Sequence, residues 1–206
     1  MAGKYILREA CIDDCRVIHN LLQELTKYDK KPEEYENKIE TLMADGFGEQ
    51  AWFKCIVAEY VENNGNTEES KEIVGFVMYT FGYDGWKGRV LNITDLYITQ
   101  EHRATKLGHL ILMRLALIVE TNKVIKMCGI VSDWNTGARR FYSAVGAIDY
   151  STEVPEAQRQ HYFAASWESI KAQMKTLQGL YAKCEYDDAS DSTHIIKDSL
   201  YDNASM

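Results

Sequence analysis

Residues 89–122 read RVLNITDLYITQEHRATKLGHLILMRLALIVETN, and this stretch decides the fold. Residues 89–99 are rich in branched apolar side chains and predict a strand, whereas the apolar run from Gly108 onward predicts a buried helix. The polar loop between them leads directly into the helix. Backbone N–H groups at a helix N-terminus carry partial positive charge, so the loop suits a phosphate group. An Arg–Gly pair such as Arg103 and Gly108 also occurs in ordinary turns, and the stretch alone leaves both interpretations open.

The rest of the chain supplies alternating strands and helices around this unit. We expect one α/β (α+β mixed sheet) domain, with a central twisted mixed sheet and helices on both faces. Asp13 and Asp14 are expected to cap the first helix, and the polar segment 29–37 is a loop or the start of a second helix. The expected strands are 4–10, 52–60, 72–83, 89–99, 124–132 and 159–165, and the expected helices are 13–28, the segment around Ile39 to Met43, 108–122, 135–145 and 166–184.

Length and composition limit the class of protein. A chain of 206 residues with 46% apolar residues can bury one sizeable core. Only two prolines occur, so no proline-rich linker divides the chain. We therefore expect one domain over residues 1–182, followed by an acidic, flexible tail over residues 183–206.

Charge and cysteine content exclude several functions. Acidic residues outnumber basic ones by 31 to 23, which argues against nucleic acid or an anionic membrane as partner and favours a cationic ligand. An acidic surface that keeps the protein in solution explains the same balance. No apolar run resembles a signal peptide or a membrane span, and the five cysteines are scattered, so a reducing cytoplasmic setting is expected. Cys11 and Cys15 have no second pair to complete a zinc site, and we expect no metal.

Several dispersed motifs together point to one family. ELTKYD, DGFGEQ, CIVAEY, EIVGFVMYTFGYDGWKG and SDWNTGARRFYSAVGA occur in order within residues 4–175. In this the chain resembles the GNAT acetyltransferases, and within them the diamine branch that acetylates spermidine, spermine and thialysine. The resemblance implies the GNAT fold, acetyl-coenzyme A as cosubstrate and a homodimer. It also implies a small cationic amine as acceptor: a polyamine, a diamine, an agmatine-like guanidine or a thialysine-like amino acid.

The resemblance places coenzyme A on the loop of the opening stretch. Its pyrophosphate would lie on the loop and its pantetheine arm along strand 89–99, where a backbone N–H near Tyr97 or Ile98 would stabilise the oxyanion. Lys106 stands where the family has glycine; it adds bulk and a cation, so we expect a usable loop that loses about 1–2 kcal/mol of binding. The cofactor contacts implied are Leu96, Tyr97, Ile98, Arg103, Ala104, Thr105, Lys106, Leu107, Gly108 and Asn135.

The same resemblance implies a catalytic acid and shows that this chain lacks the family's catalytic base. Tyr142 matches the tyrosine that protonates the departing thiolate, although a core tyrosine would have the same spacing. The glutamate that helps to deprotonate the amine in the family is replaced by Thr94, which cannot take a proton at neutral pH. Glu33 and Glu34 are our candidates for the base, with Asp95 as another. A solvated charged loop explains Glu33 and Glu34 equally well.

Acidic and aromatic residues are expected to bind the amine. Each carboxylate can pair with an ammonium group, and aromatic rings, Tyr83 among them, can cover the methylene groups and attract the cation. Each aspartate is also an ordinary turn or surface residue when taken alone. The substrate contacts implied are Tyr28, Asp29, Asp84, Trp86, Thr94 and Asp95.

A different class of function remains open at this stage. The changes at Thr94 and Lys106 are compatible with a silent relative that binds coenzyme A or a protein partner. Asn135 and Tyr142 are intact, which favours an enzyme. Acetylation of proteins needs an open peptide groove, and the hairpin around Tyr83 is expected to close the pocket against peptides.

Overall fold

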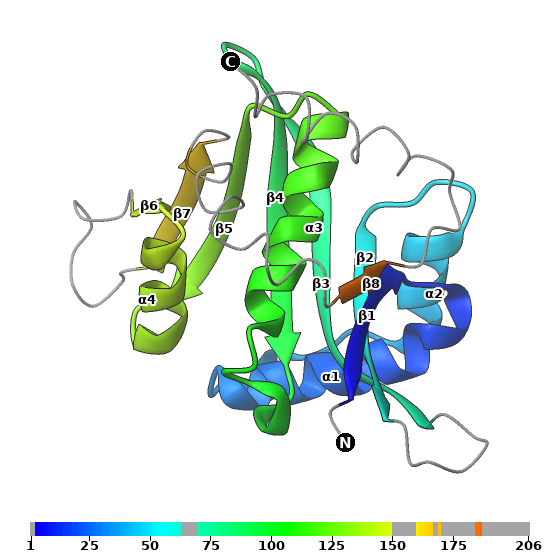
Figure 1. The fold of residues 1–206 in the computed structure, drawn as a ribbon. Coiled ribbons are helices and arrows are strands. Elements are labelled where there is room, and N and C mark those ends of the chain that lie inside the picture. The colour runs from blue at the N-terminus through cyan, green and yellow to red at the C-terminus, as the bar shows by residue number, and fades with distance from the viewer. Residues whose placement is uncertain (1–2, 63–69, 150–159, 167–168, 170–183, 187–206) are drawn as a thin grey trace.

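The computed structural model describes residues 3–62, 70–149, 160–166, 169 and 184–186 (Figure 1). These residues form one eight-stranded sheet with the strand order β6-β7-β5-β4-β3-β2-β1-β8. Its strands are β1 (Lys4–Glu9), β2 (Lys54–Glu62), β3 (Ser70–Asp84), β4 (Gly88–Ile98), β5 (Lys126–Ser132), β6 (Ile148–Asp149), β7 (Gln160–Ser166) and β8 (Cys184–Tyr186).

The sheet is mixed, as expected. Strands β1 to β4 pair antiparallel, β4 pairs β5 in parallel, and β7 pairs antiparallel with β5. The parallel pairing between β4 and β5 extends only from Val90–Lys126 to Ile93–Gly129. Both strands continue beyond these positions, so the sheet splits between their carboxyl ends. Ile130 of β5, beyond the last residue that pairs with β4, is 64% exposed.

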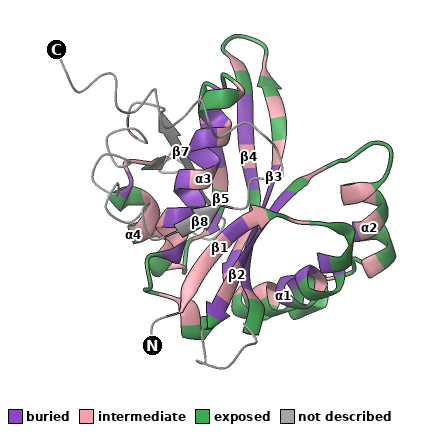
Figure 2. Cartoon of the chain, turned by 45° about the vertical axis from the view of Figure 1, so that its right-hand side comes forward, coloured by how far each residue is buried: buried purple, intermediate pink, exposed green. Residues whose placement is uncertain are grey.

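Helices cover both faces of the sheet (Figures 1 and 2). Helix α3 supplies most of its apolar side chains to one core, with Leu115 and Ala116 fully buried against β1 to β4. On the opposite face, α1 and α2 pack their apolar sides on Val57, Phe76 and neighbouring residues. The helices are α1 (Cys15–Tyr28), α2 (Ile39–Phe47), α3 (Leu107–Thr121) and α4 (Thr136–Ala144), with 3-10 turns at Ile12–Asp14, Pro32–Glu34 and Gln100–His102.

The fold class is confirmed, and several local details differ from the expectation. Asp14 makes no side-chain cap on α1; it is buried and forms an ion pair with Arg8 at 2.7 Å, because β1 brings that guanidinium beside the 3-10 turn. Cys184–Tyr186, expected in the flexible tail, form β8 and pair in parallel with β1. The helix expected over 166–184 lies outside the described residues, except for Ser166 in β7, the helical Ser169 and Cys184 in β8.

Candidate functional site

The loop between β4 and α3 has an unusual backbone. After the 3-10 turn Gln100–His102, Ala104 and Lys106 both adopt left-handed conformations, with φ of 60° and 71°. Lys106 is the N-cap residue of α3. A side chain at such a φ value is disfavoured by contact between Cβ and the backbone, whereas glycine tolerates it. The family resemblance places glycine at position 106, and the left-handed backbone there is one that glycine adopts readily. Lys106 adopts it with steric strain.

This loop presents free backbone donors. Among the described residues, the N–H groups of residues 104–108 have no hydrogen-bond acceptor, and they surround the N-terminus of the long helix α3. Gly108 lets α3 approach α4 closely, since a Cβ there would lie 3.2 Å from the Phe141 ring. Unpaired N–H groups at a helix N-terminus bind phosphate. The loop therefore fits the pyrophosphate of a nucleotide cofactor despite the lysine.

The split between β4 and β5 continues this site. Leu96, Tyr97 and Ile98 pair with β3 on one side, and within the described chain no strand pairs with them on the side facing β5. Unpaired strand backbone can bind the amides of an extended ligand, as in the addition of a strand to a sheet edge. An extended ligand lying in the split would have one end near α4 and its other end at the loop before α3.

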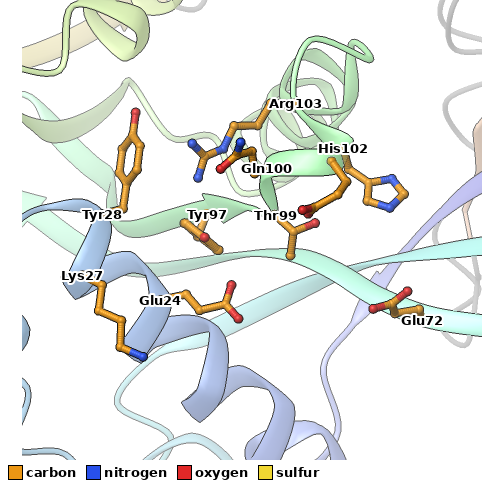
Figure 3. A pocket seen from close by; sticks show the side chains of 10 residues that line it. Glu24, Lys27, Tyr28, Glu72, Tyr97, Thr99, Gln100, His102 and Arg103 are labelled. Carbon is orange, nitrogen blue, oxygen red and sulfur yellow. The ribbon is translucent and has the colours of Figure 1, made fainter.

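The Arg103 side chain packs against the end of α1 and against β4. Its guanidinium carbon is 4.4 Å from the centre of the Tyr28 ring and 5.3 Å from that of Tyr97, and its Nε donates to the Ile98 carbonyl at 2.9 Å. Figure 3 shows the side chain directed toward Tyr28, over a cavity of about 690 Å³ on the α1 side of the sheet. The cavity is also lined by Glu24, Glu72 and Glu101.

Asp95 and Asp29 both lie on the α1 side of the sheet. Asp95 pairs with Met78, whose side chain belongs to the core beneath α1 and α2, and a bulge at the preceding residue leaves Thr94 exposed. Burial raises the pKa of Asp95, and the hydroxyl of Thr94 opposes that rise. Burial and the nearby charge of Asp95 raise the pKa of Asp29. Two carboxylates that disfavour each other's charge form a site that a cation stabilises.

Glu33 and Glu34 are exposed on the 3-10 turn that follows α1. Glu34 forms an ion pair with Lys31 at 3.1 Å, the arrangement of a solvated charged loop. Tyr35, the next residue, is turned inward and packs on His19 of α1 with ring centroids 5.3 Å apart. Sequence reasoning did not single out Tyr35 or His19; the available signal was one aromatic residue within an otherwise charged loop.

Asn135 and Tyr142 lie on α4, beyond the end of β5. The Asn135 side-chain oxygen caps the helix by accepting from the Ala138 N–H at 3.1 Å, and it accepts from the Tyr28 hydroxyl at 3.5 Å. Within the described part of the chain, the amide nitrogen of Asn135 has no acceptor. Tyr142 is half-buried beside α3, and burial raises its pKa to about 12. Its phenol therefore stays protonated at every physiological pH.

Trp134 joins these elements, although no role was assigned to it from the sequence. Its ring packs on Tyr28 at 5.3 Å between centroids, and the ammonium of Lys30 lies 4.8 Å above it. Arg103 also contacts the Tyr28 ring, so aromatic and cationic side chains connect the end of α1 with the loops that follow β4 and β5.

The structure separates Asp84 and Trp86 from the other expected substrate residues. Both belong to the β3–β4 hairpin, where Asp84 accepts from the N–H groups of Trp86 at 3.0 Å and Lys87 at 3.2 Å, which lowers the pKa of Asp84. Trp86 is 96% exposed, and its neighbour Tyr83 is 77% exposed. Asp84 pairs with Gly88, and a strand rises about 3.3 Å per residue, so roughly 20 Å of β4 separates this hairpin from Asp95.

Comparison with known proteins gives consistent relatives. The family described as "Acetyltransferase (GNAT) family" matches residues 17–147. The thialysine N-epsilon-acetyltransferase of Bos taurus is 33% identical over 166 residues, which cover 81% of this chain and 95% of that protein. The human spermidine/spermine N(1)-acetyltransferase-like protein 1 is 35% identical over 147 residues, which cover 71% of this chain and 21% of that protein.

Solved structures share the fold at low sequence identity. The PaiA N-acetyltransferase of Thermoplasma acidophilum, solved in complex with coenzyme A, superposes with a TM-score of 0.55 at 14% identity, covering 81% of this chain and 99% of that chain. Its likeness bears on the fold alone.

Proposed function

The chain belongs to the acetyltransferase (GNAT) family, and from this premise we propose that it transfers the acetyl group of acetyl-coenzyme A to a small cationic amine. It is an N-acetyltransferase, as are the relatives that it matches over most of its length. The observation that carries the proposed cosubstrate is the row of free N–H groups at residues 104–108, which continues into the split between β4 and β5. Coenzyme A, with a pyrophosphate and an extended arm, has the chemistry that both parts of this site suit.

Asp95 is the best-supported candidate for the proton acceptor. It lies in the stretch of β4 that borders the split, and its raised pKa makes it a stronger base than an ordinary aspartate. Asp29 beside it adds a second negative charge that attracts the ammonium form of the amine. Glu33 and Glu34 are exposed, and their contacts give them no preference over Asp95.

Tyr142 is the proposed general acid. The cosubstrate supplies an acetyl thioester, and the sulfur needs a proton when its bond to the acetyl group breaks. A phenol with a pKa of about 12 keeps its proton until a strongly basic group forms next to it. The amide N–H groups of Asn135 have no acceptor among the described residues and would bind the pantetheine arm, while the side-chain oxygen holds the N-terminus of α4.

The substrate class follows from charge. Asp29 and Asp95 suit a protonated amine, and the relatives are named for acetylation of thialysine and of spermidine or spermine. We propose a polyamine, a diamine, agmatine or a thialysine-like amino acid as acceptor. Because Thr94 replaces the family's glutamate, we favour the other amines of this class over spermidine as the specific acceptor.

A homodimer would give the β3–β4 hairpin a role. Asp84 and Trp86 lie in the hairpin before β4 and are too far from Asp95 to reach it in the same chain. The exposed rings of Tyr83 and Trp86 suit a contact with a second copy of the chain. We propose that the hairpin of one subunit approaches the amine site of its partner. This would reconcile the residues implied by the family resemblance with their positions in a single chain.

The test is thiol release from acetyl-coenzyme A with putrescine, spermidine, agmatine, thialysine, an arylalkylamine and a lysine peptide as acceptors. The Tyr142→Phe variant serves as the catalytic control. Turnover on a cationic small amine that falls in the variant supports the proposal and identifies the acceptor. Binding of coenzyme A by calorimetry without turnover on any acceptor would replace it with the silent relative. Turnover on the peptide alone would place the substrate among proteins.

A further inference from the structure

The hydroxyl group of Tyr35 is buried and unused. Its oxygen is shielded from solvent and has no hydrogen-bond partner among the described residues. Tyr35 ends the 3-10 turn Pro32–Glu34, so it belongs to the connection between α1 and α2. A buried hydroxyl without a partner costs about 1–3 kcal/mol. A buried polar group without a protein partner calls for another one, such as a water molecule, an ion or a ligand.

His19 holds the Tyr35 ring in place. The two rings meet edge to face, with centroids 5.3 Å apart and planes at 74°, and Tyr35 packs on the core beneath α1 and α2. The Nδ1 atom of His19 is also buried without a partner in the described part of the chain. The imidazole therefore acts on Tyr35 through packing, and the phenol oxygen stays free for another partner.

The nearest charged chemistry is that of the amine site. Asp95 projects from β4 toward the core that Tyr35 packs on, because its pairing partner Met78 belongs to that core. Asp29 ends α1 and Tyr35 follows the 3-10 turn after it, so both lie on the face of the sheet toward which Asp95 projects. The charge of Asp95 raises the pKa of both Tyr35 and Asp29, after the larger effect of burial on each. Glu33 and Glu34, the other acidic residues of the loop, are exposed to solvent.

We infer that the Tyr35 hydroxyl, together with Asp29 and Asp95, binds a primary ammonium group of the acceptor and selects it over methylated amines. A primary ammonium carries three N–H donors, and the hydroxyl oxygen and the two carboxylates offer an acceptor for each. A quaternary ammonium keeps the charge but has no N–H to donate. The inference rests on the proposed amine site and adds to it the feature of the amine that is recognised.

Binding of two probes to the full-length protein tests this without turnover. The probes are 1,3-diaminopropane and its hexamethyl bis-quaternary analogue, measured by calorimetry. The wild type is expected to bind the diamine at least tenfold more tightly than the analogue. Tyr35→Phe removes only the oxygen atom and is expected to weaken diamine binding about tenfold while leaving the analogue unchanged, so that the preference collapses.

Tyr79→Phe is the matched control. Tyr79 is also a buried tyrosine, but it packs in the core beneath α3 on the opposite face of the sheet. Its loss should leave the preference intact. An unchanged preference in Tyr35→Phe would overturn the inference, as would a wild type that binds neither probe. Thiol release by the wild type separates the two proposals: a hydroxyl-dependent preference without acetyl transfer keeps this inference and removes the catalytic one.

Discussion

The guanidinium carbon of Arg103 lies 4.4 Å from the centre of the Tyr28 ring, which joins the cofactor loop to the end of α1. The residue that follows Tyr28 in the chain is Asp29, one of the two carboxylates of the proposed amine site. The contact between Arg103 and Tyr28 therefore connects the candidate cofactor site with the candidate amine site. A change at either residue is expected to act on both ligands.

Replacement of the Tyr28 ring should loosen the cofactor loop. Tyr28→Leu removes a cation–π contact worth about 1 kcal/mol and is expected to weaken coenzyme A binding about fivefold. Tyr28→Phe is the control, because it keeps the ring under Arg103 and loses only the 3.5 Å contact with Asn135. Calorimetry with coenzyme A distinguishes them. Equal loss in both variants would assign the effect to the hydroxyl and not to the ring.

Lys106→Gly should stabilise the protein. The substitution relieves a left-handed backbone at φ 71°, for a gain of about 0.5–1 kcal/mol in the free energy of unfolding after the added flexibility of the unfolded chain. Lys106→Ala keeps the strain and removes the ammonium. Denaturant titration should rank glycine above lysine and alanine. Coenzyme A affinity measured on the same variants reports the contribution of the charge, and equal stability of all three would contradict a strained loop.

Tyr142→Phe should lower kcat by about 10²–10⁴ with little change in coenzyme A binding. Because burial raises the pKa of Tyr142 to about 12, the phenol keeps its proton through pH 10, where an exposed tyrosine ionises. The wild-type rate should therefore show no decline centred near pH 10. Such a decline, absent from a residual Tyr142→Phe activity, would show that the phenol titrates at its ordinary value.

Asp95→Asn should lower the activity and raise the free energy of unfolding. The folded pKa of Asp95 lies above its unfolded value, so its contribution favours folding at low pH and is lost as the pH rises through the folded pKa. Above that folded pKa the ionised, half-buried carboxylate opposes folding, and the asparagine variant should there be the more stable protein. That advantage should shrink as the pH is lowered through the folded pKa. Denaturant titrations at pH 7 and pH 4 measure it, and an advantage that grows on acidification would reverse the sign.

Subunit mixing tests whether the hairpin acts on a partner. If Asp84 serves the neighbouring site, dimers that combine a Tyr142→Phe subunit with an Asp84→Asn subunit carry one intact site. Random mixing of the two inactive proteins should then restore about a quarter of the wild-type activity. Recovery should require dissociation and reassembly, followed by thiol release. No recovery after verified exchange would place Asp84 in its own subunit's site or outside any site.

The unit of β4, loop and α3 could be predicted because its signals are local. The apolar run from Leu107 to Val119 specifies a buried helix, and the preceding polar residues specify its start. The expectation of glycine at Lys106 likewise agrees with a left-handed backbone at that position. The capping role given to Asp14 was wrong because Arg8, on the neighbouring strand, binds its carboxylate.

The sequence by itself determined the mixed sheet and the strand–loop–helix unit of β4 and α3, since periodicity and turn residues act over a few neighbours. Only the tertiary structure decided which polar groups meet. It placed Asp95 of β4 on the same face of the sheet as Asp29 and as the Tyr35 hydroxyl, which has no partner among the described residues, and it placed Asp84 at the far end of β4. The physical reason is that strand pairing and helix packing set distances between residues far apart in the chain, and these distances fix where buried charge collects.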